Sequence, residues 1–216
     1  MDSFLDTNII VHYANFTEQT KNNLIRKCFE YIQNKEGSFI ISMYVKKELE
    51  GVIKKRAIMY KLILDSLIKG SFIESNELSK NDLPYAKKQY EYLKDNNNAQ
   101  EILFNDLDSF KNRIYWFEKK ILDELVLSEA DIDIILVKII REFILDYSDC
   151  MVLASAIQIQ QDKEQLFFVT ADNHFDLGGS SAWYNFGRNC AIDHTPYDRT
   201  LLVDTDYMVN SADLLI

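Results

Sequence analysis

The sequence predicts an α/β fold in which a mainly parallel central sheet is flanked by helices. Short apolar runs of strand length alternate along the chain with longer segments in which apolar residues recur every three or four positions. The 216 residues include only 6 glycines and 2 prolines, too few for the many turns of an all-β sandwich or barrel. We therefore expect a single domain over residues 1–216, with a helical insertion at about residues 71–127.

The first part of the chain contains two predicted strands, each followed by a helix. Ser3–Leu5 is a short strand, and the polar residues Asp6–Asn8 end it and open a helix. A single apolar stripe predicts a helical segment over Thr17–Asn34. Ser38–Ser42 is a second buried strand, and the apolar stripe after it predicts a long helix over Tyr44–Lys69.

The middle of the chain is predicted to be helical and the C-terminal part to return to strands. Ser79–Leu127 has a helical pattern throughout, apart from a polar turn at Asp95–Asn98 that separates two helices. The later predicted elements are a helix from Ser128, a helix from about Asp146, a strand at Leu166–Thr170 and a strand at Thr200–Val203. Alternation of strands with helices on both sides of a helical middle is typical of a parallel sheet.

Composition limits the class of protein. The chain has 34 acidic and 24 basic residues, a net charge of −10, which argues against a non-specific nucleic-acid coat. It does not argue against a nuclease, because divalent metals can lie between carboxylates and phosphates. The 3 cysteines are widely spaced and favour neither a zinc site nor a disulfide framework. The N-terminus lacks the basic region of a signal peptide, and Ile132–Leu145 is too charged and short to span a membrane, so a cytoplasmic protein without membrane contact is expected.

Five acidic residues occupy positions that should converge. Asp6 follows the first strand, Glu48 lies one turn into the helix after the second, and Asp149 lies in the first turn of a later helix. Asp172 and Asp176 follow the last long strand. The carboxyl ends of parallel strands share one edge of a sheet, where ligands bind. Clustered carboxylates repel one another unless a cation neutralises them, and oxygen-only ligands favour Mg²⁺ or Mn²⁺.

Four segments resemble the motifs of the PIN-domain family of metal-dependent ribonucleases. They are FLDTNII at Phe4–Ile10, the glutamate of VKKELEG at Val45–Gly51, SDCMVLASAI at Ser148–Ile157 and FVTADNHFD at Phe168–Asp176. The resemblance covers about residues 1–53 and 129–216. The first and last motifs are specific when taken together, whereas SDCMVLASAI alone is weak. The helical middle departs from a compact member of this family.

The resemblance implies a Mg²⁺- or Mn²⁺-dependent endoribonuclease. It assigns Asp6, Glu48, Asp149 and Asp172 to catalysis and metal binding, Asp176 to the metal as an auxiliary ligand, and Asn8 to a supporting place beside Asp6. Single-stranded RNA is the expected substrate, because its phosphates can be drawn into a carboxylate-lined cleft. Since the family is common in toxin–antitoxin pairs, toxin-like activity is a further expectation. The alternative is a catalytically inactive PIN-like module that binds RNA or a protein partner.

Some of these positions have simpler explanations. Asp6 would also serve as a helix cap, Glu50 competes with Glu48, and Asp146 competes with Asp149 at the start of the same helix. A basic run surrounds Glu48 and is expected to bind the phosphates of the substrate, unless it is a plain solvated helix face. The run consists of Lys46, Lys47, Lys54, Lys55 and Arg56.

The predicted insertion is rich in aromatic residues. A two-helix appendage cannot bury them all on itself, and exposed apolar patches usually mark contacts with other molecules. We therefore expect this region to form a homodimer or a protein-partner interface.

Overall fold

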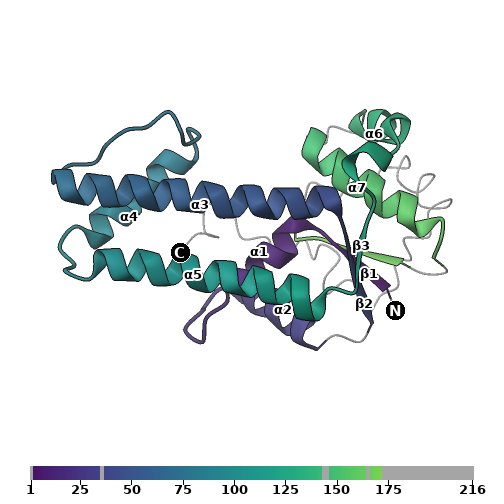
Figure 1. Cartoon of the computed structure of the whole chain (residues 1–216), viewed down its shortest axis with the longest axis horizontal. Helices are drawn as coiled ribbons and strands as arrows, with labels where there is room; N and C mark the ends of the chain where they lie inside the picture. The colour runs from purple at the N-terminus through teal and green to yellow at the C-terminus, as the bar shows by residue number, and fades with distance from the viewer. Residues whose placement is uncertain (1, 35–36, 143–145, 164–165, 172–216) are drawn as a thin grey trace.

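The computed structural model describes residues 2–34, 37–142, 146–163 and 166–171. Over these residues the chain forms seven α-helices around a four-stranded sheet (Figure 1). The strands are β1 (Asp2–Leu5), β2 (Ser38–Ser42), β3 (Glu124–Val126) and β4 (Leu166–Val169). They lie in the order β3-β2-β1-β4, and all three pairings are parallel. The predicted α/β class with a parallel sheet is confirmed over this part of the chain.

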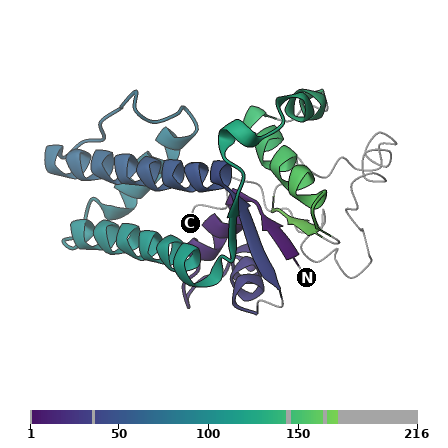
Figure 2. The ribbon, with the colours of Figure 1, turned by 45° about the vertical axis from the view of Figure 1, so that its right-hand side comes forward.

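The helices cover both faces of the sheet. They are α1 (Thr7–Asn15), α2 (Asn23–Gln33), α3 (Met43–Lys69), α4 (Asp82–Leu93), α5 (Ala99–Trp116), α6 (Ile134–Arg141) and α7 (Tyr147–Gln160). The chain places β2 and then β3 on one side of β1, and it then returns across the sheet to place β4 on the other side of β1. Because such connections are right-handed, the two groups of helices lie on opposite faces. Figures 1 and 2 show α6 and α7 on one face and α1, α2 and α5 on the other.

Local signals explain where the helices begin and end. The Asn22 side chain accepts hydrogen bonds from the backbone N–H groups of Leu24 and Ile25, at 2.9 and 3.2 Å, so α2 begins at Asn23 and not at Thr17 as the periodicity predicts. Ser42 caps α3 in the same way, and Gly70, with a φ of 74°, ends it. The helix predicted from Ser128 is a short 3-10 turn followed by α6. None of the helices in the described ranges is long and apolar enough to cross a bilayer.

The predicted insertion divides between two hydrophobic cores. The main core surrounds the sheet and includes Phe110, Ile114 and Phe117. A second core joins the far half of α3 to α4 and the start of α5. Its buried members are Met59, Leu62, Ile63, Leu78, Ala86, Tyr90, Leu93, Ala99 and Leu103. We call residues 59–103 the arm, which extends away from the sheet in Figure 1.

The prediction of a helix throughout Ser79–Leu127 is wrong at its C-terminal end, where Glu124–Val126 forms β3 and pairs with β2. A short apolar run does not by itself distinguish a helix from a strand. The polar break predicted at Asp95–Asn98 is confirmed, because α4 ends at Leu93 and α5 begins at Ala99.

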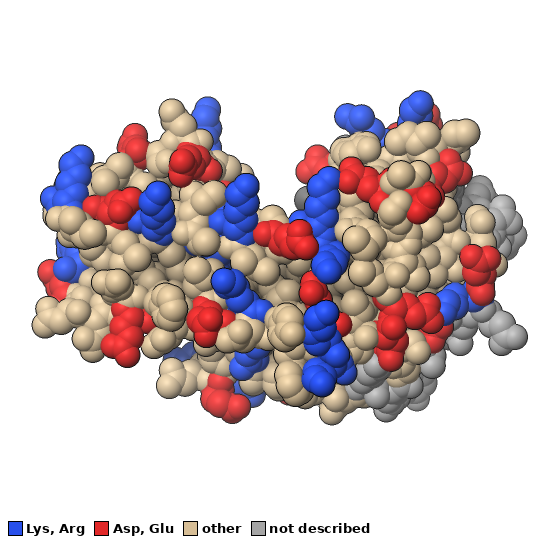
Figure 3. Space-filling model, viewed as in Figure 1, with Lys and Arg blue, Asp and Glu red and all other residues tan. Residues whose placement is uncertain are grey.

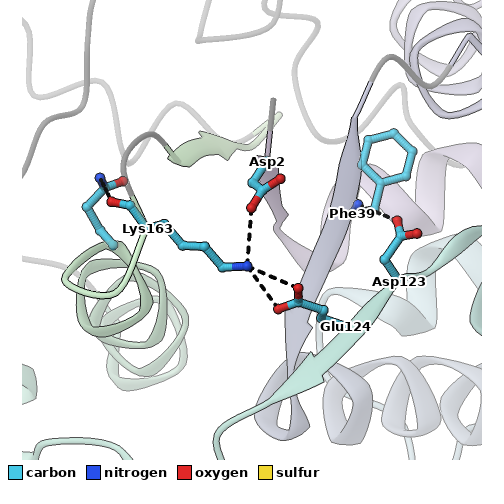
Figure 4. A network of polar contacts seen from close by, with 6 residues as sticks. Asp2, Phe39, Asp123, Glu124 and Lys163 are labelled. Atoms are coloured by element: carbon cyan, nitrogen blue, oxygen red, sulfur yellow. Dashed lines mark hydrogen bonds and ion pairs between the residues drawn. The ribbon is translucent and has the colours of Figure 1, made fainter.

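A lysine holds the edge strand at the amino end of the sheet. Lys163 Nζ lies 3.2 Å from the carboxylate of Asp2 and 3.0 and 3.1 Å from the two carboxylate oxygens of Glu124 (Figure 4). The Asp123 carboxylate accepts a hydrogen bond from the Phe39 backbone N–H at 2.8 Å. These contacts tie β3 to its neighbours at the end of the sheet opposite the strand carboxyl ends.

Arg56 joins the arm to the main core. Its guanidinium stacks 3.8 Å from the centre of the Phe110 ring, donates a hydrogen bond of 2.6 Å to Asn15 and lies 3.5 Å from the Asp106 carboxylate. Only 12% of the side chain is exposed. The planar guanidinium therefore connects α3 to both α1 and α5.

We predict that Arg56→Ala lowers the free energy of unfolding by roughly 2–4 kcal/mol, because it removes a buried charge-assisted hydrogen bond and a cation–π contact. Arg56→Lys should recover only part of this, since an ammonium cannot stack in the same way. Urea denaturation followed by circular dichroism measures the change. The matched control is Lys54→Ala, at an exposed position on the same helix, which should stay within about 0.5 kcal/mol of wild type. Equal effects at the two positions would contradict the structural role of Arg56.

Candidate carboxylate site

Asp6 lies where β1 ends beside β4. Its backbone N–H donates a hydrogen bond of 3.0 Å to the Val169 carbonyl, and its side chain is only 6% exposed. Asp6 Oδ2 accepts hydrogen bonds from Thr170 Oγ1 at 2.6 Å and Asn8 Nδ2 at 2.8 Å. The Asn8 amide oxygen in turn accepts from the Ala171 backbone N–H at 3.0 Å. The first turn of α1 and the residues after β4 therefore hold this carboxyl group from two sides.

Glu48 points from α3 towards the start of α1 and α7. Its Oε2 accepts a hydrogen bond from the Thr7 hydroxyl, and its Oε1 accepts one from the Ser148 hydroxyl. The Tyr44 hydroxyl lies 3.5 Å from Ser148 Oγ. Glu50, the competing glutamate, is exposed to solvent. Both oxygens of Glu48 are thus oriented by groups far away in the sequence.

The charges of these carboxylates act on one another. Burial raises the pKa of Asp6 most strongly, and the nearby charges of Glu48 and Asp149 raise it further. Hydrogen bonds from Thr170 and from the Thr7 backbone act in the opposite direction, and the resulting pKa is about 7. Among the described residues, no lysine or arginine forms an ion pair with Asp6 or Glu48. The carboxyl groups of Asp6, Glu48 and Asp149 therefore act on one another although they come from separate segments of the chain.

The donor atoms suit a hard divalent cation, although the described residues do not form a complete cage. They contain no group of three or more His, Cys, Asp or Glu side chains arranged to hold a metal ion. Mg²⁺ commonly keeps several waters and is bound through one or two protein carboxylates. Asp6 and Glu48, with Asp149 nearby, would supply such a set. Asp172 and Asp176 lie outside the described residues.

Most of the basic run is paired within the molecule. Lys47 Nζ lies 2.6 Å from Glu129, Lys55 Nζ lies 2.8 Å from Asp82, and Arg56 forms the contacts described above. A phosphate would have to replace these internal partners at Lys47, Lys55 and Arg56. Lys54 is exposed and Lys46 is half-buried, and neither has an ion-pair partner among the described residues.

The molecule has a hollow beside α3. Figure 3 shows a hollow over the first half of α3, between the arm and the helices α6 and α7. Glu48 lies near the start of α3, and Asp149 lies in the first turn of α7.

Three hydroxyl residues at the site are not singled out by the sequence pattern. Thr7 and Ser148 bind Glu48, and Thr170 binds Asp6. Thr7 and Ser148 are adjacent in sequence to the predicted site residues Asp6 and Asp149, and Thr170 is two residues before Asp172. This proximity is the signal that the sequence offers for them. The residues that share a hydrogen bond are separated by 41, 100 and 164 positions, so only the tertiary fold pairs them.

We predict that Asp6 makes the metal-free protein less stable as the pH rises. Folded Asp6, with a pKa of about 7, holds a proton that the unfolded chain releases near pH 3.8. The protonated Asp6 therefore contributes fully to the free energy of unfolding below pH 3.8, and this contribution is lost as the pH rises through 7. At about 1.4 kcal/mol per pH unit, the whole contribution is about 4 kcal/mol. Asp6→Asn should remove this slope and be more stable than wild type at pH 8 in EDTA.

Urea titrations of both proteins between pH 4 and 8 test this prediction. Buried His12, whose pKa is lowered to about 4, contributes in the opposite sense between pH 6.5 and 4. Its contribution cancels when the two curves are subtracted. Parallel curves for wild type and Asp6→Asn would contradict the assignment of a protonated, buried Asp6.

Comparison with known proteins does not place this chain in a family: no protein-family model, no curated protein and no solved structure matches it.

Proposed function

We propose that the protein is a Mg²⁺- or Mn²⁺-dependent ribonuclease of the PIN type that hydrolyses phosphodiester bonds of single-stranded RNA. One observation carries the proposal: Asp6, a buried carboxyl group at the carboxyl edge of a parallel sheet, lies in the field of two further carboxylates, Glu48 and Asp149. Carboxylates in this arrangement are costly to the fold unless a cation is bound. Ligand binding at this edge is the general behaviour of such sheets.

The chain's own residues have distinct roles in this proposal. Asp6, once deprotonated, Glu48 and Asp149 would hold the ion. When bound, a divalent ion supplies positive charge for the phosphoryl and leaving oxygens and lowers the pKa of the attacking water. Asn8 and Thr170 donate hydrogen bonds to Asp6 and so favour its ionised form.

Glu48 is held in one orientation by its two hydroxyl partners, Thr7 and Ser148. A carboxylate oriented in this way loses less conformational entropy when it binds an ion or a water. Its two hydroxyl partners come from the first turns of α1 and α7, so Glu48 also links α3 to these two helices.

We predict that the full chain cleaves labelled single-stranded RNA in Mn²⁺ or Mg²⁺ and not in EDTA. Asp6→Asn and Glu48→Gln should each lower the rate at least about 100-fold, because each removes a hard oxygen ligand. The control is Glu50→Gln, which removes an exposed carboxylate two residues along the same helix and should leave the rate nearly unchanged.

Calorimetric titration with Mn²⁺ gives a second readout that is independent of cleavage. Wild type and Glu50→Gln should bind the ion with similar affinity, and Asp6→Asn should bind it more weakly. Full activity of Asp6→Asn at saturating Mn²⁺ would overturn the site. RNA binding without cleavage or ion binding would instead support the catalytically inactive module.

A further inference from the structure

The outer face of α5 and its final turn carries exposed aromatic and basic side chains. We call these residues the α5 strip: Phe104, Lys111, Tyr115, Trp116, Lys119 and Lys120. The three aromatic residues expose 69%, 62% and 53% of their surface, in chain order. All three lysines are exposed beside the last two rings.

The helix periodicity separates the α5 strip from the core. Phe104, Lys111 and Tyr115 are seven and four residues apart and so share one side of α5. Phe110 and Ile114, on the other side, are buried in the main core. The fold therefore uses one face of α5 and leaves the aromatic face in water. Adjacent exposed aromatic residues are uncommon on a surface that binds nothing.

The local charge of this segment is opposite to that of the whole chain. The chain has a net charge of −10, whereas Lys111–Lys120 contains four basic residues and one acidic residue, Glu118, which is half-buried. Asp108, one turn before the segment, already accepts a hydrogen bond of 2.8 Å from Asn112. The acids of α5 itself, Glu101, Asp106 and Asp108, all precede this segment, and Asp106 and Asp108 already accept hydrogen bonds from Tyr60 and Asn112.

Aromatic and basic groups are interleaved at the end of the strip. Lys119 Nζ lies 6.0 Å from the centre of the Tyr115 ring. The backbone after Trp116 forms a π-helical turn, Phe117–Ile121, which is rare and frequently marks a functional site. Bases that stack on rings beside cations that bind phosphates are the usual means of holding single-stranded nucleic acid.

The strip lies on a helix that packs beside α3. α3 and α5 are antiparallel, and Arg56 of α3 meets Asp106 and Phe110 of α5. Glu48 precedes Arg56 by eight residues, which is about 12 Å along α3. Trp116 follows Phe110 by six residues, which is about 9 Å along α5. Both steps lead towards the sheet. Trp116 is therefore nearly level with Glu48 along the two helices, and the chain then continues through Lys119 and Lys120 towards β3.

We propose that the α5 strip binds single-stranded RNA, with bases stacked on its aromatic rings and phosphates paired with its lysines. This deepens the proposed function, on which it rests for the choice of RNA. The strip would hold the strand along α5, and the carboxylates would act on one of its phosphates. Stacking requires unpaired bases, so a duplex of the same sequence uses only the lysines.

Binding of labelled RNA to the full chain in EDTA, followed by fluorescence anisotropy, tests the proposal. The double variant Tyr115→Ala/Trp116→Ala should bind single-stranded RNA at least about fivefold more weakly, and its affinity for the duplex should change less. The triple variant Lys111→Gln/Lys119→Gln/Lys120→Gln should lower the slope of log affinity against log salt by about 2. The matched control, Lys88→Gln/Tyr92→Ala, removes an exposed lysine and an exposed aromatic from α4 and should bind as wild type does.

The outcomes separate this proposal from the cleavage site. Because EDTA removes the divalent ion, weaker binding by the strip variants supports the strip even if the chain never cleaves RNA. Unchanged binding by both strip variants would overturn it, as would an equal loss in the control. Sedimentation of wild type and Tyr115→Ala/Trp116→Ala is the final comparison: a dimer that the variant dissolves, with RNA affinity unchanged, would make the strip a protein interface and overturn RNA binding.

Discussion

The hydrogen bond from the Asp6 backbone N–H to the Val169 carbonyl extends the pairing of β1 with β4 one residue beyond the end of β1, and the carboxylate arrangement depends on it. It fixes the position of the Asp6 side chain beside Thr170, where Asn8 completes the contact. The Asp6 carboxyl group is buried in this position, with only 6% of the residue exposed. Its charge is therefore unfavourable in the absence of a cation, which is why its pKa rises to about 7.

The same constraint explains why hydroxyl groups surround the acids. A lysine or arginine at this place would neutralise the carboxylates. Thr7, Ser148 and Thr170 instead satisfy individual carboxylate oxygens without adding charge. The site thus keeps its negative potential while the side chains remain ordered.

One long helix relates the site to the rest of the molecule. α3 has 27 residues, about 40 Å, with Glu48 near its start, Arg56 in its middle and the second core along its far half. Because this helix is continuous, it connects the arm to the end of β2 without an intervening loop. The internal pairing of Lys55 and Arg56 follows from this architecture: both side chains bind the helices that α3 supports.

The sequence by itself determined the α/β class, the positions of three of the four described strands and the long helix after β2. Apolar runs and periodicity depend on residues close together in the chain, so these features can be predicted locally. Only the tertiary structure decided that Glu124–Val126 pairs with β2, that Arg56 stacks on Phe110, and which hydroxyls meet Asp6 and Glu48. Each of these depends on contacts between distant residues, whose geometry no local pattern records. The strand order β3-β2-β1-β4 belongs to the second group for the same reason: it depends on pairing between strands far apart in the chain, and with right-handed connections it decides which helices cover which face.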